Sequence, residues 1–244
     1  MINNLYLGSM FRNIFLFIFL ILSANVLISQ MTATELLDKS IAFHDPKNQW
    51  EKFDGTLKFI VERPDKPNGK RKVHINNKED SFSFWAQYED GLLNYTVKNN
   101  QGSASWNGSK EISEELTKKY RISPDRAIMY RDYYTYLYGM PMKLKDEGTI
   151  IDPELTQLEF YGKTYNRIRV SYTPEVGKDI WYFYFNSENH ALEAYQFFHD
   201  ETKNDGEYML FSELKEIQKV KMPRIRAWYY NKDEKYLATD ILEN

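Results

Sequence analysis

The chain has 244 residues, a formal net charge of −3 and no cysteine. The lack of cysteine excludes a disulfide framework and a thiol nucleophile, and the mild acidity argues against nucleic-acid binding, because nucleic-acid-binding domains are usually basic. Aromatic residues make up 16% of the chain, and its 19 tyrosines suit half-buried pleated surfaces, where the ring packs and the hydroxyl stays wet.

The first feature along the chain is an unbroken apolar run, Ile14–Leu22, preceded by Arg12 and followed by small residues. A basic flank, an apolar core of 7–15 residues and small residues beyond it are typical of a secretory signal peptide. We therefore expect 1–29 to be a cleaved signal, with Met10 as an alternative start, and 30–244 to be a single domain. An uncleaved membrane anchor is the alternative, although a spanning helix needs about 20 apolar residues.

The first element of the expected domain is a helix. Thr32 and Glu35 have the spacing of a capping box, and Asp45–Pro46 ends the pattern. Alternation of apolar and polar residues then predicts a meander of strands joined by tight turns. The expected strands are Phe53–Glu62, Arg71–Asn76, Phe82–Tyr88, Leu93–Val97 and Ser103–Trp106, with turns at Arg63–Lys70, Glu89–Gly91 and Asn100–Gly102.

The pattern changes in the middle of the chain. Ser123 followed by Pro124 is a helix start, and Gly139 is a helix stop. The segment between them predicts an aromatic helix over Ser123–Tyr138, and Ile112–Lys119 is a candidate for a shorter one.

The last third returns to strands. Ile180–Phe185 (IWYFYF) is apolar on both faces, which indicates a central strand covered on each side. The other expected strands are Leu158–Tyr161, Tyr165–Tyr172, Ala191–His199, Tyr208–Ile217, Pro223–Tyr230 and Tyr236–Ile241. Nine or ten strands with two or three helices predict an α+β fold with one antiparallel sheet.

The chain contains no HExxH, GxSxG, P-loop or GxGxxG motif. Its four histidines are scattered, and only His44–Asp45 and His199–Glu201 combine histidine with acid. These two segments are candidates for a metal site or a general base, but a helix end and a turn explain them more simply. We expect no catalytic residues, no metal and no cofactor. The basic stretch Lys66–Lys72 is either a solvated hairpin tip or a contact for anionic lipid.

The apolar residues carry more information about a site. A sheet of this size with few helices tends to curl and to leave a concave apolar face, which is a candidate ligand site. The alternative is that its large rings simply fill the core. The candidate ligand-binding residues are Phe84, Trp106, Tyr130, Tyr134, Leu137, Tyr138, Trp181 and Phe183.

This layout resembles the periplasmic lipoprotein-carrier (Lol-type) superfamily. The likeness rests on the order of a first helix at Thr32–His44, a strand set at Phe53–Trp106, a helix at Ser123–Tyr138 and strands at Leu158–Ile241. Ala42–Pro46 and Met222–Tyr229 (MPRIRAWY) are also similar to an uncharacterised group of exported Gram-negative proteins. The resemblance implies a curved, unclosed antiparallel half-barrel with an N-terminal helix and a mid-chain lid helix.

It also implies a non-enzymatic periplasmic binding or carrier protein that holds a lipid, an acyl chain or a lipidated partner in an apolar concavity. Its partners would be an apolar ligand or a lipidated protein, with contact to a membrane surface and none to nucleic acid, and we expect a monomer. An envelope scaffold or sensor that binds another protein at a sheet edge is one alternative, and a hydrolase without a recognisable motif is another.

Overall fold

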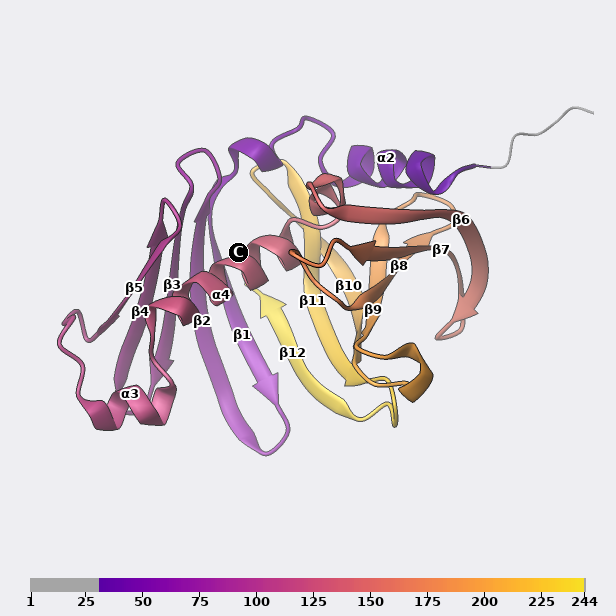
Figure 1. The fold of residues 1–244 in the computed structure, drawn as a ribbon. Coiled ribbons are helices and arrows are strands. Elements are labelled where there is room, and N and C mark those ends of the chain that lie inside the picture. Colours follow the sequence, from indigo (N-terminus) through magenta and orange to yellow (C-terminus); the bar gives the residue numbers. More distant parts are fainter. Residues whose placement is uncertain (1–30, 244) are drawn as a thin grey trace, which may run out of the picture. The chain divides into compact units, whose positions relative to one another are not determined.

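The computed structural model describes residues 31–243, so the expectations for residues 1–29 lie outside the described part. Within it, 12 strands form one antiparallel sheet that curves around a helix, which confirms the expected α+β half-barrel (Figure 1). The helices are α2 (Ala33–His44), α3 (Glu114–Tyr120) and α4 (Pro124–Tyr138), with short 3-10 turns η1 (Trp50–Lys52), η2 (Met142–Lys145) and η3 (Glu201–Lys203). The strands are β1 (Asp54–Arg63), β2 (Lys66–Asn76), β3 (Ser81–Tyr88), β4 (Gly91–Lys98), β5 (Gln101–Trp106), β6 (Thr149–Phe160), β7 (Lys163–Tyr172), β8 (Ile180–Asn186), β9 (Leu192–Phe198), β10 (Glu207–Ile217), β11 (Val220–Tyr230) and β12 (Tyr236–Leu242).

The sheet consists of two meanders joined by a single long-range pairing. Its order is β5-β4-β3-β2-β1-β12-β11-β10-β9-β8-β7-β6, so all neighbours except β1 and β12 are consecutive in the chain. In that pairing Phe59 lies opposite Leu242. The edges β5 and β6 do not pair with each other, and the barrel therefore stays open.

Alternation along the strands gives the sheet a concave inner face and an outer face. On β8, Trp181 and Phe183 point inward, whereas Tyr182 and Tyr184 point outward. The ring of Phe160 covers Tyr184 from outside, with centroids 4.2 Å apart. Both faces of β8 are therefore covered, as its sequence predicts.

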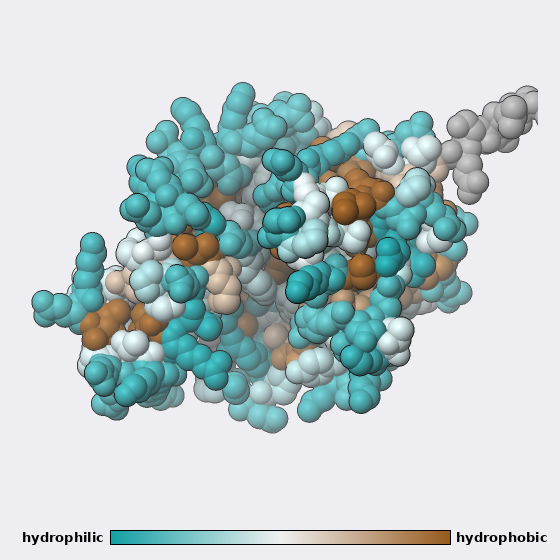
Figure 2. Space-filling view, viewed as in Figure 1, coloured by the Kyte–Doolittle hydropathy of each residue, from teal (hydrophilic) through white to brown (hydrophobic). Residues whose placement is uncertain are grey.

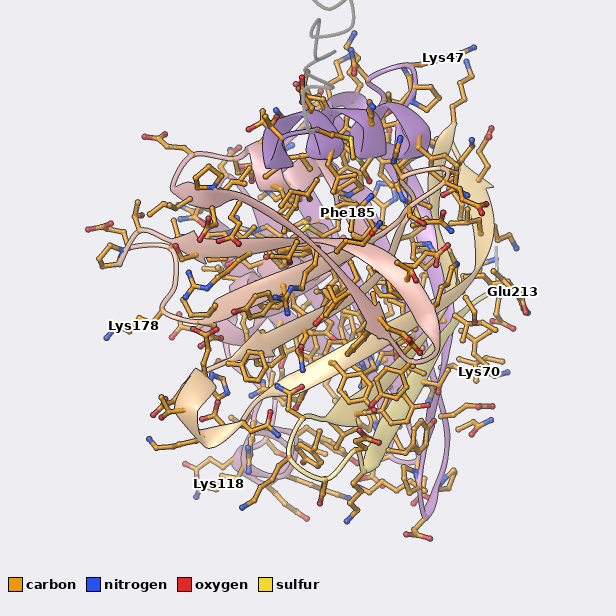
Figure 3. The ribbon with its side chains drawn as sticks, turned by 90° about the vertical axis from the view of Figure 1, so that its right-hand side faces the viewer. Lys47, Lys70, Lys118, Lys178, Phe185 and Glu213 are labelled. Carbon is orange, nitrogen blue, oxygen red and sulfur yellow. The ribbon has the colours of Figure 1, made fainter. Side chains whose placement is uncertain are left out.

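Helix α2 begins with the expected capping box. The amide of Glu35 donates to Thr32 Oγ1 at 3.2 Å, and the amide of Thr32 donates to Glu35 Oε2 at 2.8 Å. The helix packs against β6 and β11. In the side view Phe185 of β8 lies in the interior of this region, whereas Lys47 and Lys178 reach outward (Figure 3).

Helix α4 lies along the inner face of β3, β4 and β5. Ser123 caps it by accepting a hydrogen bond from the amide of Arg126 at 3.2 Å, and Gly139 ends it. Gly102 of β5 permits the close approach, because a Cβ there would lie 2.2 Å from the carbonyl oxygen of Pro124.

Two of the expected turns are wrong by a few residues. The predicted turn over Arg63–Lys70 is only Pro64–Asp65, and Asn68–Gly69 lies inside β2, because β1 and β2 stay paired as far as Arg63 and Lys66. The turn expected at Asn100–Gly102 lies at Asn99–Asn100, where both residues have positive φ, 48° and 59°. Asparagine adopts this conformation more easily than most residues, and Gly102 is thereby free to belong to β5.

Candidate functional site

A cavity of about 740 Å³ lies between α4 and the inner face of β8–β11. One wall is formed by five residues of α4, Asp132, Tyr133, Thr135, Tyr136 and Leu137, and the strands form the other. In the space-filling view the surface is recessed between these two parts, and apolar side chains border the recess among hydrophilic ones (Figure 2). This volume lies within the range of small-molecule sites, roughly 300–1,000 Å³.

Aromatic rings from both walls line the cavity. They are Tyr133 and Tyr136 of α4, Tyr172 of β7, Trp181 of β8, Phe197 of β9 and Trp228 of β11. The rings of Trp181 and Phe197 stack at 4.8 Å, and Tyr136 meets the edge of Trp181 at 5.4 Å. Because these rings come from four strands and one helix, the lining depends on the curvature of the sheet.

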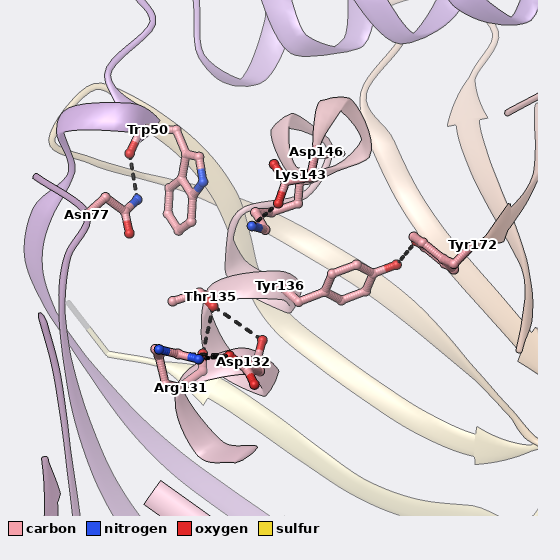
Figure 4. Close-up of polar contacts among 9 residues, drawn as sticks. All are labelled: Trp50, Asn77, Arg131, Asp132, Thr135, Tyr136, Lys143, Asp146 and Tyr172. Atoms are coloured by element: carbon pink, nitrogen blue, oxygen red, sulfur yellow. Dashed lines mark hydrogen bonds and ion pairs between the residues drawn. The ribbon is translucent and has the colours of Figure 1, made fainter. Parts of the chain in front are cut away.

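The hydroxyls of Tyr136 and Tyr172 bond to each other and link α4 to β7 (Figure 4). Burial raises the pKa of Tyr136 well above its usual value and raises the pKa of Tyr172 to about 12. Both side chains are therefore neutral near pH 7 and offer hydroxyls to this end of the cavity. Lys143 of η2 forms an ion pair with Asp146 at the same end.

Three further titratable residues line the cavity, Asp179, His199 and Glu207. The His199 ring bonds to Asp179 at 2.8 Å, and this hydrogen bond raises the pKa of His199 above its usual value. Glu207 of β10 is half-buried, and burial raises the pKa of its carboxyl.

A second cavity, of about 250 Å³, adjoins the first and shares Tyr133, Glu207 and Trp228 with it. Its other lining side chains come mainly from β1, β2 and β12. They include Arg71, whose Nη1 donates to Tyr134 Oη at 3.3 Å, and the buried Asp240. The concave face is therefore hollow on the β8–β12 side of α4.

Comparison with known proteins gives the chain a family. The sequence model of a family of unknown function, DUF6503, matches residues 12–244. The chain belongs to this family. No curated protein matches its sequence.

The chain is also similar to solved structures. A LolA superfamily protein from Nitrosomonas europaea is 10% identical, with a TM-score of 0.53 over 88% of this chain and 93% of its own. A domain described as an outer membrane lipoprotein-sorting protein, from Vibrio parahaemolyticus, is 8% identical, with a TM-score of 0.48 over 85% and 92% of the two chains. The first likeness shows that this chain has the Lol-type fold expected from its layout.

The eight residues predicted as a binding site fall into separate groups. Only Leu137 and Trp181 line the large cavity. Phe183 lies beside Trp181, with ring centroids 6.0 Å apart, and is fully buried. Trp106 is remote from both cavities and packs between Tyr88 and Tyr120.

The other four predicted residues pack against one another between α4 and the first meander. Tyr130 stacks on Phe84 at 4.4 Å, and Tyr134 lies 5.8 Å from the same ring. Tyr138 packs on Phe59 at 4.8 Å, beneath the guanidinium of the buried Arg226. These rings fill the half of the concave face that α4 covers.

The prediction of ligand-binding residues missed the cavity-lining rings on the opposite side of α4 and on strands β9 and β11. Tyr133 and Tyr136 lie on the cavity side of α4, and Phe197 and Trp228 lie on the inner faces of β9 and β11. The sequence contained a signal for two of them, because Phe197 lies two residues from Tyr195 and therefore shares its face of the strand, and Tyr133 lies off the stripe of residues 130, 134 and 138.

The described residues 31–243 contain no cluster of three metal-ligating side chains. His44 is the last residue of α2 and is fully buried, and its two ring nitrogens bond to backbone groups, which supports the structural interpretation of this histidine. In the same part of the chain no helix is both long and apolar enough to cross a bilayer.

Proposed function

We propose that this protein is a non-enzymatic binding or carrier protein that holds an apolar ligand in the large cavity. The ligand would be a lipid, an acyl chain or the lipid part of a lipidated partner. Residues 1–29, outside the described part, would direct its export to the periplasm, as their apolar run suggests.

The observation that carries this proposal is the uneven filling of the concave face. On the β3–β5 side the tyrosines of α4 stack directly on the sheet, and Tyr134 is fully buried there. On the β8–β11 side the same helix stands away from the strands and leaves about 740 Å³ lined by six aromatic rings. Protein interiors are otherwise close-packed, so a hollow of this size has room for a ligand.

The fold likeness supports the proposal at a coarser level. The Nitrosomonas protein, named as a member of the LolA superfamily, shares the half-barrel over most of both chains. The fold by itself assigns no ligand, because one fold can serve several functions. The lining of this chain's own cavity therefore carries the argument.

Uptake of the neutral fluorophore N-phenylnaphthylamine tests the proposal. We expect the wild type to bind it at micromolar concentrations with an increase in fluorescence. Replacing Trp228 by alanine should weaken binding about tenfold, because burying one aromatic side chain contributes roughly 1.5–3 kcal/mol and 1.4 kcal/mol is one decade.

The matched control is Trp85→Ala. Trp85 lies on the outer face of β3, where the ammonium of Lys72 sits 4.0 Å from its ring centroid, and it lines neither inner cavity. This variant should bind the probe as the wild type does. A wild type that takes up no probe would contradict the proposal, and a partner protein bound at the edge of β5 or β6 would then be the leading alternative.

A further inference from the structure

The large cavity carries an excess of negative charge. Its lining includes five carboxylates against one lysine and one histidine. The acidic residues are Asp132, Asp146, Glu147, Asp179 and Glu207. Lys143, His199 and Arg131 pair with three of them, Asp146, Asp179 and Asp132 respectively.

Glu207 is half-buried and lies at the junction of the two cavities, since it lines both of them. Within residues 31–243 its carboxylate forms no hydrogen bond and no ion pair, although His199 is near enough to lower its pKa. It lies opposite Phe197 in the ladder between β10 and β9, and Trp228 borders the same space. A half-buried carboxylate without a donor is costly, so a ligand that supplies a positive charge and N–H donors gains here.

Asp240 is a second buried carboxylate, in the adjoining cavity. Its side chain is only 5% exposed, and in the described part of the chain its carboxylate likewise has no hydrogen bond and no ion pair. Arg63 and Arg71 line the same small cavity, and Arg71, Arg226 and Arg63 all act on the Asp240 carboxylate through space. The three arginines therefore lie around Asp240, whereas the large cavity is lined by five carboxylates against one lysine and one histidine.

The aromatic lining favours the same sign of charge. The faces of aromatic rings are negative and attract ammonium groups, most strongly for tryptophan. Trp181 and Trp228 both border the cavity, and Tyr133 stacks parallel to Trp228 at 6.2 Å. The aromatic rings and the carboxylates together form a cavity lining that attracts cations and repels anions.

We propose that the ligand of this cavity is a cationic amphiphile, with an amine or quaternary ammonium group near Glu207 and Trp228 and an apolar body against the remaining rings. This inference rests on the proposed function and narrows the class of ligand. A free fatty acid, which also has an apolar chain, would bring its carboxylate into a lining that already has an excess of negative charge.

Three ligands with the same 12-carbon chain test the inference. Binding of dodecyltrimethylammonium, dodecanol and dodecanoate is measured by displacement of N-phenylnaphthylamine, below the concentrations at which they form micelles. We expect the cation to bind at least about tenfold more tightly than the alcohol, and dodecanoate to bind most weakly. The advantage of the cation should shrink as salt is added.

The outcomes separate this inference from the proposed function. Equal binding of the three ligands, or tightest binding of dodecanoate, overturns the inference and leaves the proposed function standing. Failure of every ligand and of the probe to bind overturns both.

A pair of variants locates the effect. Glu207→Gln should lower the ratio of cation affinity to alcohol affinity about tenfold, because it removes the charge and keeps the shape. Glu159→Gln, at an exposed position on β6 away from both cavities, should leave that ratio unchanged. An unchanged ratio in a folded Glu207→Gln variant contradicts the inference.

Discussion

At the residue scale, the hydrogen bonds of His44 fix the protonation state of its own ring. Its ring is fully buried and bonds to two strands at once. The amide of Leu192 donates to Nε2 at 2.9 Å, so the ring proton lies on Nδ1 and is donated to the carbonyl of Lys221 at 2.7 Å. A second proton on Nε2 would face that amide, and burial lowers the pKa of His44 to about 4.

This residue predicts a loss of stability in mild acid. The unfolded chain binds a proton at His44 near pH 6.5, whereas the folded protein binds it only near pH 4. Between these values the unfolded state binds more protons, so the free energy of unfolding falls as the pH falls. From about pH 7.5 to about pH 5 the loss from His44 is about 2 kcal/mol. Urea unfolding measures it, and NMR of the histidine rings assigns it. A His44 ring that titrates near its ordinary value would refute this explanation.

At the scale of elements, the two faces of α4 have different surroundings. The stripe of Tyr130, Tyr134 and Tyr138 packs against the first meander, and Tyr133 and Tyr136 face the cavity. The sequence predicts this helix and its ends from Ser123–Pro124 and Gly139. It does not predict which aromatic face meets the sheet, because both faces carry large rings.

If α4 is a fixed part of the core on the side that faces the first meander, shortening a buried side chain of this helix should destabilise the protein much more than shortening an exposed one. Tyr134→Ala removes a fully buried ring and the acceptor of the Arg71 hydrogen bond, and should cost about 3–5 kcal/mol of unfolding free energy. Met129→Ala, on the same helix but 45% exposed, should change it by less than about 0.5 kcal/mol. Urea unfolding compares the two, and a small cost for Tyr134→Ala would mean that α4 is a loosely held lid.

For the molecule as a whole, local patterns predict the strands, because alternation follows from the side-chain period of a strand. They do not predict the pairing of β1 with β12, which joins the two ends of the domain and positions the cavity. The candidate site was predictable only in part for the same reason. Trp106 and Trp181 both occupy inward positions, but the first packs with Tyr120 of α3 and the second lines the cavity. The helices decide which inward rings are covered.

The central claim is that the hollow between α4 and β8–β11 is where this protein holds its ligand. Photolabelling with a dodecyl probe that carries a diazirine at the chain end, followed by peptide mapping, tests it most directly. The account predicts labels on the rings that would meet the apolar body, Tyr136, Tyr172 and Trp181, and competing dodecyltrimethylammonium removes them. Labels confined to the outer face, around Trp85 and the exposed Leu92, would contradict it.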